Sequence, residues 1–175
     1  MIRKIIYGVY AILGMMTMAA CSGQSDASEI SLEKMHGFPT ENTGFLKGVS
    51  ALYAGVIDGN LLIAGGCNFP DTPAADGGKK VFYPDVYITS LSNDTAFEWK
   101  KIGQLPQAAA YGVTISTEKG LICVGGATAT HSLSDVFLLS LQKDTLKRDT
   151  LPSLPVTMDN MAGALVGHSL YIVGG

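Results

Sequence analysis

The stretch from Cys67 to Pro84, CNFPDTPAADGGKKVFYP, gathers side chains that can bind or react with a ligand. It combines an amide, an aromatic ring, carboxylates and a lysine pair, in the order Asn68, Phe69, Asp71, Asp76, Lys79 and Lys80. Amides and carboxylates hydrogen-bond hydroxyl groups, an aromatic face covers a ring, and an ammonium group binds a carboxylate. The mixture therefore suits a polar, hydroxyl-rich ligand. A solvated loop without a ligand is the alternative.

A second candidate group lies further along the chain. Asp159 and Asn160 precede a small-residue segment, MAGALVG, and a carboxylate there can act as a general acid or base, or can simply cap the strand. His131 lies in the short stretch ATATHSLS. We expect Asp159 to be catalytic. The predicted substrate-binding residues are Asn68, Phe69, Asp71, Lys79, His131 and Asn160.

A threefold internal repeat predicts the elements that position these residues. The repeated segments are VSALYAGVIDGNLLIAGG, AAAYGVTISTEKGLICVGG and DNMAGALVGHSLYIVGG. Each predicts a β-hairpin in which a small-residue strand leads through a turn to an apolar strand ending at Gly-Gly. Two more strands are predicted after each of the first two hairpins, and the first of them starts with Asp-Val-aromatic at positions 85 and 135. Because Asp85 and Asp135 recur, we interpret both as structural.

Four short strands per repeat of about 50 residues, with Gly-Gly after the second, resemble the kelch repeat, whose units are propeller blades. The predicted fold class is all-β: a partial kelch-type β-propeller with about two and a half blades of an expected six. We expect the chain to be a fragment that is inactive alone. The predicted segments are a lipoprotein signal (1–20), a linker (21–28), an orphan outer strand with lead-in (29–48), blades at 49–107 and 108–157, and a truncated blade at 158–175.

Propeller geometry places the candidate residues on one face. In a four-stranded antiparallel blade, the loop between the second and third strands and the link to the next blade emerge at the same mouth of the central channel. The first such loop is long and the second is short, and insertions on a rigid scaffold commonly carry function. We therefore expect Asp159 and His131 to share a face with the long loop.

The amino terminus predicts export. Arg3 and Lys4 precede an apolar run from Ile5 to Ala20, which is shorter than the ~18 to 20 residues that span a bilayer. Met18-Ala19-Ala20-Cys21 resembles a bacterial lipobox, so we expect lipidation at Cys21, and an ordinary cleaved signal is the alternative. The expected location is the outer membrane, as a periplasmic or cell-surface lipoprotein held by its acyl chains alone.

The charge and the cysteines argue against a nucleic-acid partner, a disulfide and a metal site. Removing residues 1–20 leaves 10 Lys and Arg residues against 15 Asp and Glu, a net charge of −5, so nucleic acid is not an expected partner. Cys67 and Cys123 each lie at a Gly-Gly strand end, and we interpret both as packed thiols rather than as a disulfide. No metal-ligand spacing is present, so no metal is expected.

Two segments carry a more specific resemblance, KGVSALYAGVIDGNLLIAGGCNFPD and GGKKVFYPDVY. They are similar to the cyclically permuted branch of the N-acetylneuraminate epimerase (sialic acid mutarotase) family, exported six-bladed kelch propellers. The resemblance implies interconversion of the α and β anomers of a sugar acid, without a metal or organic cofactor. It also implies a catalytic carboxylate and substrate-binding arginines, but the chain has only Arg3 and Arg148. Either the missing blades supply the arginine pair that binds the carboxylate, or Lys79 takes a share of carboxylate binding.

The alternative hypothesis is a non-catalytic kelch propeller that binds glycan or protein through the same loops. The fold does not decide between the two, because propellers host both functions. An acid and a cation directed at a common point would favour the enzyme. A copper radical oxidase is disfavoured, since the Tyr, Cys and His ligands are not grouped in the sequence.

Overall fold

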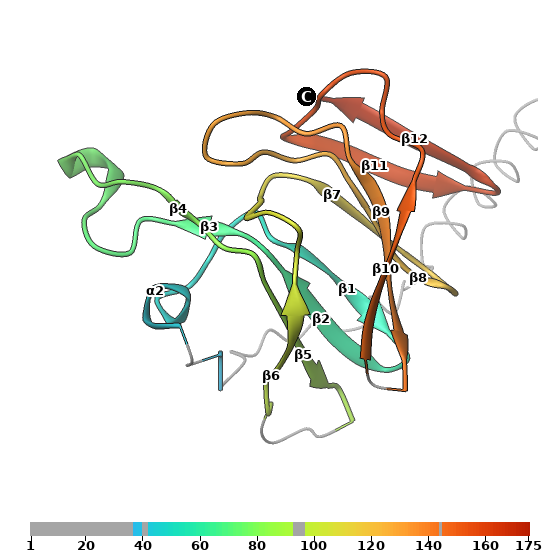
Figure 1. The fold of residues 1–175 in the computed structure, drawn as a ribbon, viewed down its shortest axis with the longest axis horizontal. Helices are drawn as coiled ribbons and strands as arrows, with labels where there is room; N and C mark the ends of the chain where they lie inside the picture. Colours follow the sequence, from blue (N-terminus) through green and yellow to red (C-terminus); the bar gives the residue numbers. More distant parts are fainter. Residues whose placement is uncertain (1–36, 40–41, 93–96, 144) are drawn as a thin grey trace, which may run out of the picture. The chain divides into compact units, whose positions relative to one another are not determined.

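The computed structural model describes residues 37–39, 42–92, 97–143 and 145–175. They form antiparallel β-strands with one short α-helix and one 3-10 turn (Figure 1). No helix within these ranges is long and apolar enough to cross a bilayer. The predicted signal, Cys21, the linker and residues 29–36 of the predicted orphan strand lie outside the described residues.

The first four-stranded sheet has the order β1-β2-β5-β6. Its strands are β1 (Tyr53–Ile57), β2 (Asn60–Ala64), β5 (Asp85–Ser90) and β6 (Lys100–Gln104). The β1–β2 hairpin turns at Asp58 and Gly59, whose φ angles of 48° and 73° are both left-handed. Such a turn matches the twist of the paired strands and favours Asp-Gly, as the sequence predicts.

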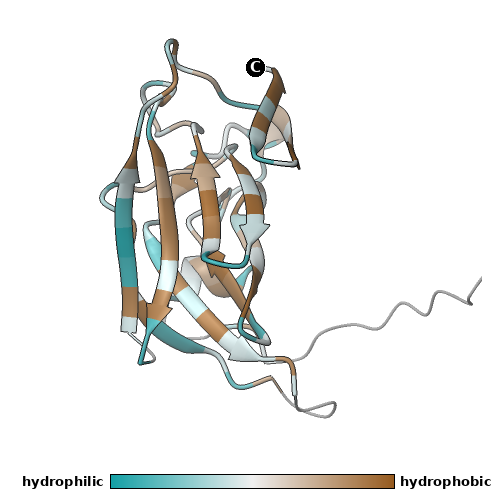
Figure 2. Ribbon diagram, turned by 90° about the vertical axis from the view of Figure 1, so that its right-hand side faces the viewer, coloured by the Kyte–Doolittle hydropathy of each residue, from teal (hydrophilic) through white to brown (hydrophobic). Residues whose placement is uncertain are grey.

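The second four-stranded sheet repeats this order, and a hairpin follows it. Its strands are β7 (Val113–Thr117), β8 (Gly120–Val124), β9 (Val136–Gln142) and β10 (Thr145–Leu151). The outermost strand, β10, is mostly exposed and largely teal in Figure 2, whereas its neighbour β9 is brown. The hairpin pairs β11 (Met161–Val166) with β12 (Ser169–Gly174).

The sheets pack face to face through apolar side chains. Leu62 and Val86 of the first sheet share one core with Leu121 and Leu139 of the second. A separate core joins the other face of the second sheet to the β11–β12 hairpin. The innermost strands β1, β7 and β11 are therefore neighbours, as blades of a propeller require.

Close backbone contacts between sheets explain the repeated Gly-Gly pairs. The Gly66 N–H donates to the Ala109 carbonyl oxygen (2.8 Å), and in the next repeat the Gly126 N–H donates to the Met158 carbonyl oxygen (2.8 Å). A Cβ on Gly65 would lie 2.3 Å from the Ala109 carbonyl oxygen. Since Gly65 also has a φ of 68°, both space and conformation require glycine there.

Two small elements are not predicted by the repeat. Helix α2 (Thr43–Leu46) begins at Asn42, whose side-chain oxygen accepts from the Gly44 and Phe45 N–H groups. The predicted long loop contains a two-stranded ribbon, β3 (Cys67–Asn68) and β4 (Val81–Phe82), which projects from the first sheet with η1 (Ala74–Asp76) at its tip (Figure 1).

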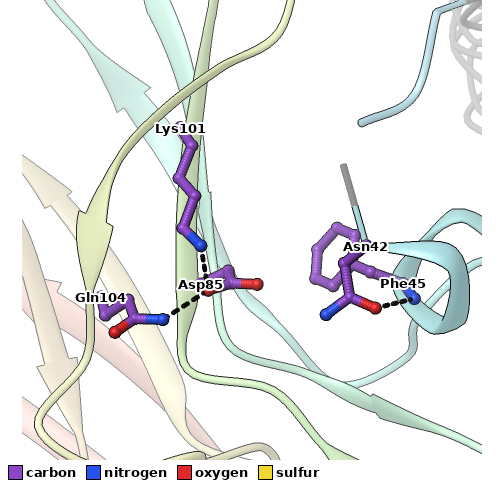
Figure 3. A network of polar contacts seen from close by, with 5 residues as sticks. All are labelled: Asn42, Phe45, Asp85, Lys101 and Gln104. Atoms are coloured by element: carbon purple, nitrogen blue, oxygen red, sulfur yellow. Dashed lines mark hydrogen bonds and ion pairs between the residues drawn. The ribbon is translucent and has the colours of Figure 1, made fainter. Parts of the chain in front are cut away.

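Asp85 is buried at the start of β5 and has a structural role, as predicted, but through side-chain partners. Its carboxylate pairs with Lys101 (2.8 Å) and accepts from the Gln104 amide (2.8 Å), as Figure 3 shows. Burial raises the pKa of Asp85, but hydrogen bonds from Gln104 and Lys101 and the Lys101 charge outweigh it, so the pKa lies below the ordinary value. The equivalent Asp135 is exposed; its carboxylate accepts from the Gln107 amide (3.3 Å), and its carbonyl oxygen accepts from the Gly125 N–H (2.8 Å).

The two described cysteines are free and buried, as predicted. Cys123 is fully enclosed, and burial raises the pKa of its thiol to about 12. Cys67 is 1% exposed and contacts the candidate site described next.

Candidate functional site

The β3–β4 ribbon brings the unrepeated part of the long loop against the start of the second blade. Cys67 pairs with Phe82 across the ribbon, and Asn68 pairs with Val81. A further bridge joins Cys67 to Ser50, ahead of β1, which fixes the base of the ribbon on the first sheet. The ribbon is therefore an ordered platform.

Side chains of this ribbon contact Tyr111, which precedes β7. Lys80 Nζ donates a hydrogen bond to Tyr111 Oη (2.6 Å), and Cys67 Sγ donates to the same oxygen (3.3 Å). The ring of Phe82 meets the Tyr111 ring edge to face at 6.3 Å between centroids. We call these residues, together with Phe69, the Tyr111 cluster.

The charge in the Tyr111 cluster is carried by Lys80. Its ammonium nitrogen lies 4.9 Å from the centroid of the Tyr111 ring and 5.4 Å from that of Phe69, within the range of cation–π attraction. The hydrogen bond to Tyr111 raises the pKa of Lys80, so the side chain is a cation at neutral pH.

Backbone bonds across three blades hold Tyr111 in place. Tyr111 has a left-handed φ of 66°, its N–H donates to the Ala51 carbonyl oxygen (2.8 Å), and its own carbonyl oxygen accepts from the Asn160 N–H (2.9 Å). Ala51 and Asn160 are also left-handed, with φ of 56° and 53°. The three residues occupy the same place in their repeats, so each blade presents one side chain from an equivalent backbone position.

Asp159 forms a second polar group beside this backbone chain. Its carboxylate accepts a hydrogen bond from Ser132 Oγ, which comes from the β8–β9 loop, and another from Asn160 Nδ2 (2.5 Å). The expectation that the second-to-third loops and the inter-blade links share a face is thus confirmed by the Lys80–Tyr111 and Ser132–Asp159 contacts. The Asp159 carboxylate is half-buried and oriented by two donors.

A hollow of about 350 Å³ lies beside the Tyr111 cluster. It is lined by Phe82 of the ribbon, by the link before β7 and by the β8–β9 loop; the lining residues are Phe82, Gln107, Ala108 and 128–131. Its size falls in the range of small-molecule sites. His131, one of the predicted binding residues, lines it and is held by the Thr128 and Thr130 hydroxyl groups at 3.1 and 3.0 Å.

The other predicted binding residues have different surroundings. The Asn68 amide donates to the Gly44 and Gly48 carbonyl oxygens (2.7 Å each) and accepts from the Tyr83 hydroxyl (2.8 Å), so it ties α2 to the ribbon. Phe69 is 36% exposed beneath Lys80.

Asp71 and Lys79 stand apart from the Tyr111 cluster. Asp71 lines a different hollow of about 530 Å³, between α2 and the ribbon. Lys79 is exposed, and no hydrogen bond or ion pair joins it to the residues that the structure describes. Sequence reasoning thus singled out Lys79, whereas Lys80 makes the contacts.

Comparisons of the sequence with known proteins agree on one family. A family model described as N-acetylneuraminate epimerase matches residues 8–147. N-acetylneuraminate epimerase 1 of Escherichia coli O6:H1 is 30% identical over 149 residues, which cover 79% of this chain and 39% of that protein. N-acetylneuraminate epimerase of Brucella suis is 37% identical over 98 residues, 53% of this chain and 25% of that protein.

A solved structure supports the fold. The structure of YjhT matches with a TM-score of 0.51 and 27% sequence identity, over 58% of this chain and 31% of that chain. The antiparallel sheets are accordingly those of a partial kelch-type propeller. The chain spans 39% or less of the length of the relatives named here.

Proposed function

The chain belongs to the N-acetylneuraminate epimerase family, and on that premise we propose that its propeller interconverts the α and β anomers of N-acetylneuraminate. The observation that carries the proposal is the family match over residues 8–147. The face that presents Asp159 and Lys80 supports it, because an acid and a cation there suit a sugar acid.

The chemistry requires two proton transfers. A base removes the proton of the anomeric hydroxyl while an acid protonates the ring oxygen, the ring C–O bond breaks, and the open ketone recloses from its other face. In this proposal Asp159 is the base, and the hydrogen bonds from Ser132 and Asn160 hold its carboxylate in place.

Proton NMR of freshly released α-anomer tests the proposal. The intact protein is expected to speed the growth of the β-anomer signal in proportion to its concentration. An unchanged rate, with binding of the sugar acid retained, would favour the second candidate: a glycan-binding propeller. The aromatic rings and the Lys80 cation around Tyr111 are of the kind that favours such binding.

We also propose that the protein is an outer-membrane lipoprotein, anchored at Cys21 by acyl chains and facing either the periplasm or the cell exterior. The Met18-Ala19-Ala20-Cys21 sequence motivates this proposal. Mass spectrometry of the membrane-extracted protein should find acylation at Cys21, and Cys21→Ser should release the protein from the membrane fraction. A wild-type chain recovered without lipid would refute the anchor.

A further inference from the structure

The Tyr111 hydroxyl has a single proton, and the described residues provide no acceptor for it. A phenol oxygen offers two lone pairs and one O–H. Lys80 Nζ and Cys67 Sγ donate to both lone pairs, at 2.6 and 3.3 Å. Because an ammonium group can only donate, the O–H points away from Lys80 and is available to a ligand in the adjacent space.

Lys80 has unused donors as well. An ammonium group carries three N–H bonds, and one is directed at Tyr111. Within the described ranges, ion pairs join Lys101 to Asp85 and Lys147 to Asp149, and none involves Lys80. Two aromatic rings flank its nitrogen in place of a carboxylate. The cluster is therefore rich in donors, positively charged and without an anionic partner of its own.

The position of Tyr111 is fixed, whereas Lys80 is an exposed side chain of the ribbon that reaches the Tyr111 hydroxyl. Tyr111 is bonded through its backbone to the first and third repeats, and its ring packs against Phe82. The Cys67 thiol behind the hydroxyl is 1% exposed. A preorganised phenol loses little conformational entropy when a ligand binds.

We propose that Lys80 and Tyr111 together bind the carboxylate of the sugar acid, one oxygen accepting from the ammonium and the other from the phenol. This inference rests on the proposed function for the identity of its ligand. A neighbouring ammonium and hydroxyl can satisfy both carboxylate oxygens, as a bidentate arginine does elsewhere. Arg148, the arginine among the described residues, lies on the outer strand β10 and is not part of the Tyr111 cluster.

The adjoining hollow has room for the rest of the sugar. Phe82 lines it and also packs against Tyr111, so the space of about 350 Å³ lies next to the Tyr111 cluster. Thr128 and Thr130 also line it, and their hydroxyls suit the hydroxyl groups of a sugar.

A matched pair of ligands tests the inference: N-acetylneuraminate and its methyl ester, which keeps the ring but loses the negative charge. Calorimetric titration of the intact protein should show a preference for the acid of about tenfold or more. Lys80→Met should remove most of that preference, and Tyr111→Phe should reduce it several-fold. Lys119→Met, which removes a lysine from the β7–β8 turn, should leave the preference unchanged.

Several results would overturn the inference. One is a preference for the acid over the ester that survives in both Lys80→Met and Lys80→Gln. Another is a loss of this preference in Lys79→Met that equals the loss in Lys80→Met. The third is a wild-type protein that binds neither ligand. The NMR rate assay separates this inference from the proposed function. A wild-type protein that binds the acid through Lys80 but leaves the anomer rate unchanged would refute the epimerase and keep the carboxylate site.

Discussion

The Tyr53 hydroxyl of the first sheet donates a hydrogen bond to the Gly125 carbonyl oxygen of the second, across 2.5 Å. Tyr53 is fully buried, and burial raises the pKa of its phenol far above the ordinary value, so the hydroxyl remains a donor throughout the useful pH range. The bond joins a strand to the Gly-Gly end of the neighbouring blade.

Tyr53→Phe should therefore destabilise the protein. Loss of the donor leaves a buried carbonyl oxygen without this partner, which typically costs about 1 to 3 kcal/mol. Urea denaturation should show the loss in the free energy of unfolding. Tyr171→Phe serves as the control because Tyr171 is 56% exposed on β12, and similar values for both variants would contradict the assigned role.

Gly65→Ala should be far more damaging than Gly59→Ala. Both glycines have left-handed φ angles, so alanine is strained at each by about 1 to 2 kcal/mol. A Cβ at position 59 meets nothing within 4 Å, whereas one at position 65 meets the Ala109 carbonyl oxygen. We expect the free energy of unfolding of Gly65→Ala to fall by at least about 2 kcal/mol more, because the added methyl group overpacks the contact between blades. Equal thermal shifts would rule out the inter-blade contact as the reason for Gly65.

Asp85 should make the free energy of unfolding depend on pH in the acid range. Because its folded pKa lies below the unfolded value of about 3.9, its stabilisation is complete above that pH and is lost as pH falls through the folded pKa. Asp85→Asn should cost about 1 to 2 kcal/mol at pH 7 and should flatten the fall in stability below about pH 4. Lys101→Met should cost less, since the lysine is partly exposed. An acid profile unchanged in Asp85→Asn would contradict this account.

Cys123 should resist alkylation in the folded protein. A thiol with a pKa of about 12 holds little thiolate at pH 8, and we expect iodoacetamide to react about a thousandfold more slowly than with an ordinary cysteine. Peptide mass spectrometry reports each cysteine separately, and reaction at the ordinary rate in denaturant is the control. Rapid modification without denaturant would show that Cys123 is not enclosed.

Asp159→Asn should lower the rate of anomer conversion by about 10² to 10⁴-fold, the usual contribution of a general base. Affinity for N-acetylneuraminate should change little, because the amide keeps the shape of the side chain. Asp58→Asn is the matched control, since Asp58 lies in the β1–β2 turn, where Asn tolerates the left-handed backbone. A variant with undiminished activity would remove Asp159 from the mechanism.

The hairpins were predictable because the repeat and its turn residues act locally. Asp58 and Gly59 specify a turn by themselves, and three Gly-Gly pairs in register specify where the apolar strands end. Helix α2 and the β3–β4 ribbon were not predictable, since a four-residue helix and two-residue strands show no periodicity.

The candidate site was predictable only in outline. The long loop and the shared face followed from the repeat, but the choice between Lys79 and Lys80 depends on how the ribbon lies, which the sequence does not show. Tyr111 was missed because a tyrosine carries no sign of a left-handed backbone. Alignment of the repeats places Tyr111 at the same position as Ala51 and Asn160. The side-chain type differs between the repeats at this position, and that variation was the signal that could have identified Tyr111.

The hydrogen-bonded chain of Ala51, Tyr111 and Asn160 has a consequence for engineering. Each residue already adopts the same left-handed conformation while bearing a methyl, a phenol or a carboxamide, so the scaffold accepts different chemistry at that point without changing its path. Each of the three repeats thus offers one position at which the side chain can be exchanged while the backbone keeps its conformation. Single side chains at these positions are therefore the natural choice for altering ligand preference, and Asn and Asp are the easiest to introduce because they tolerate this conformation.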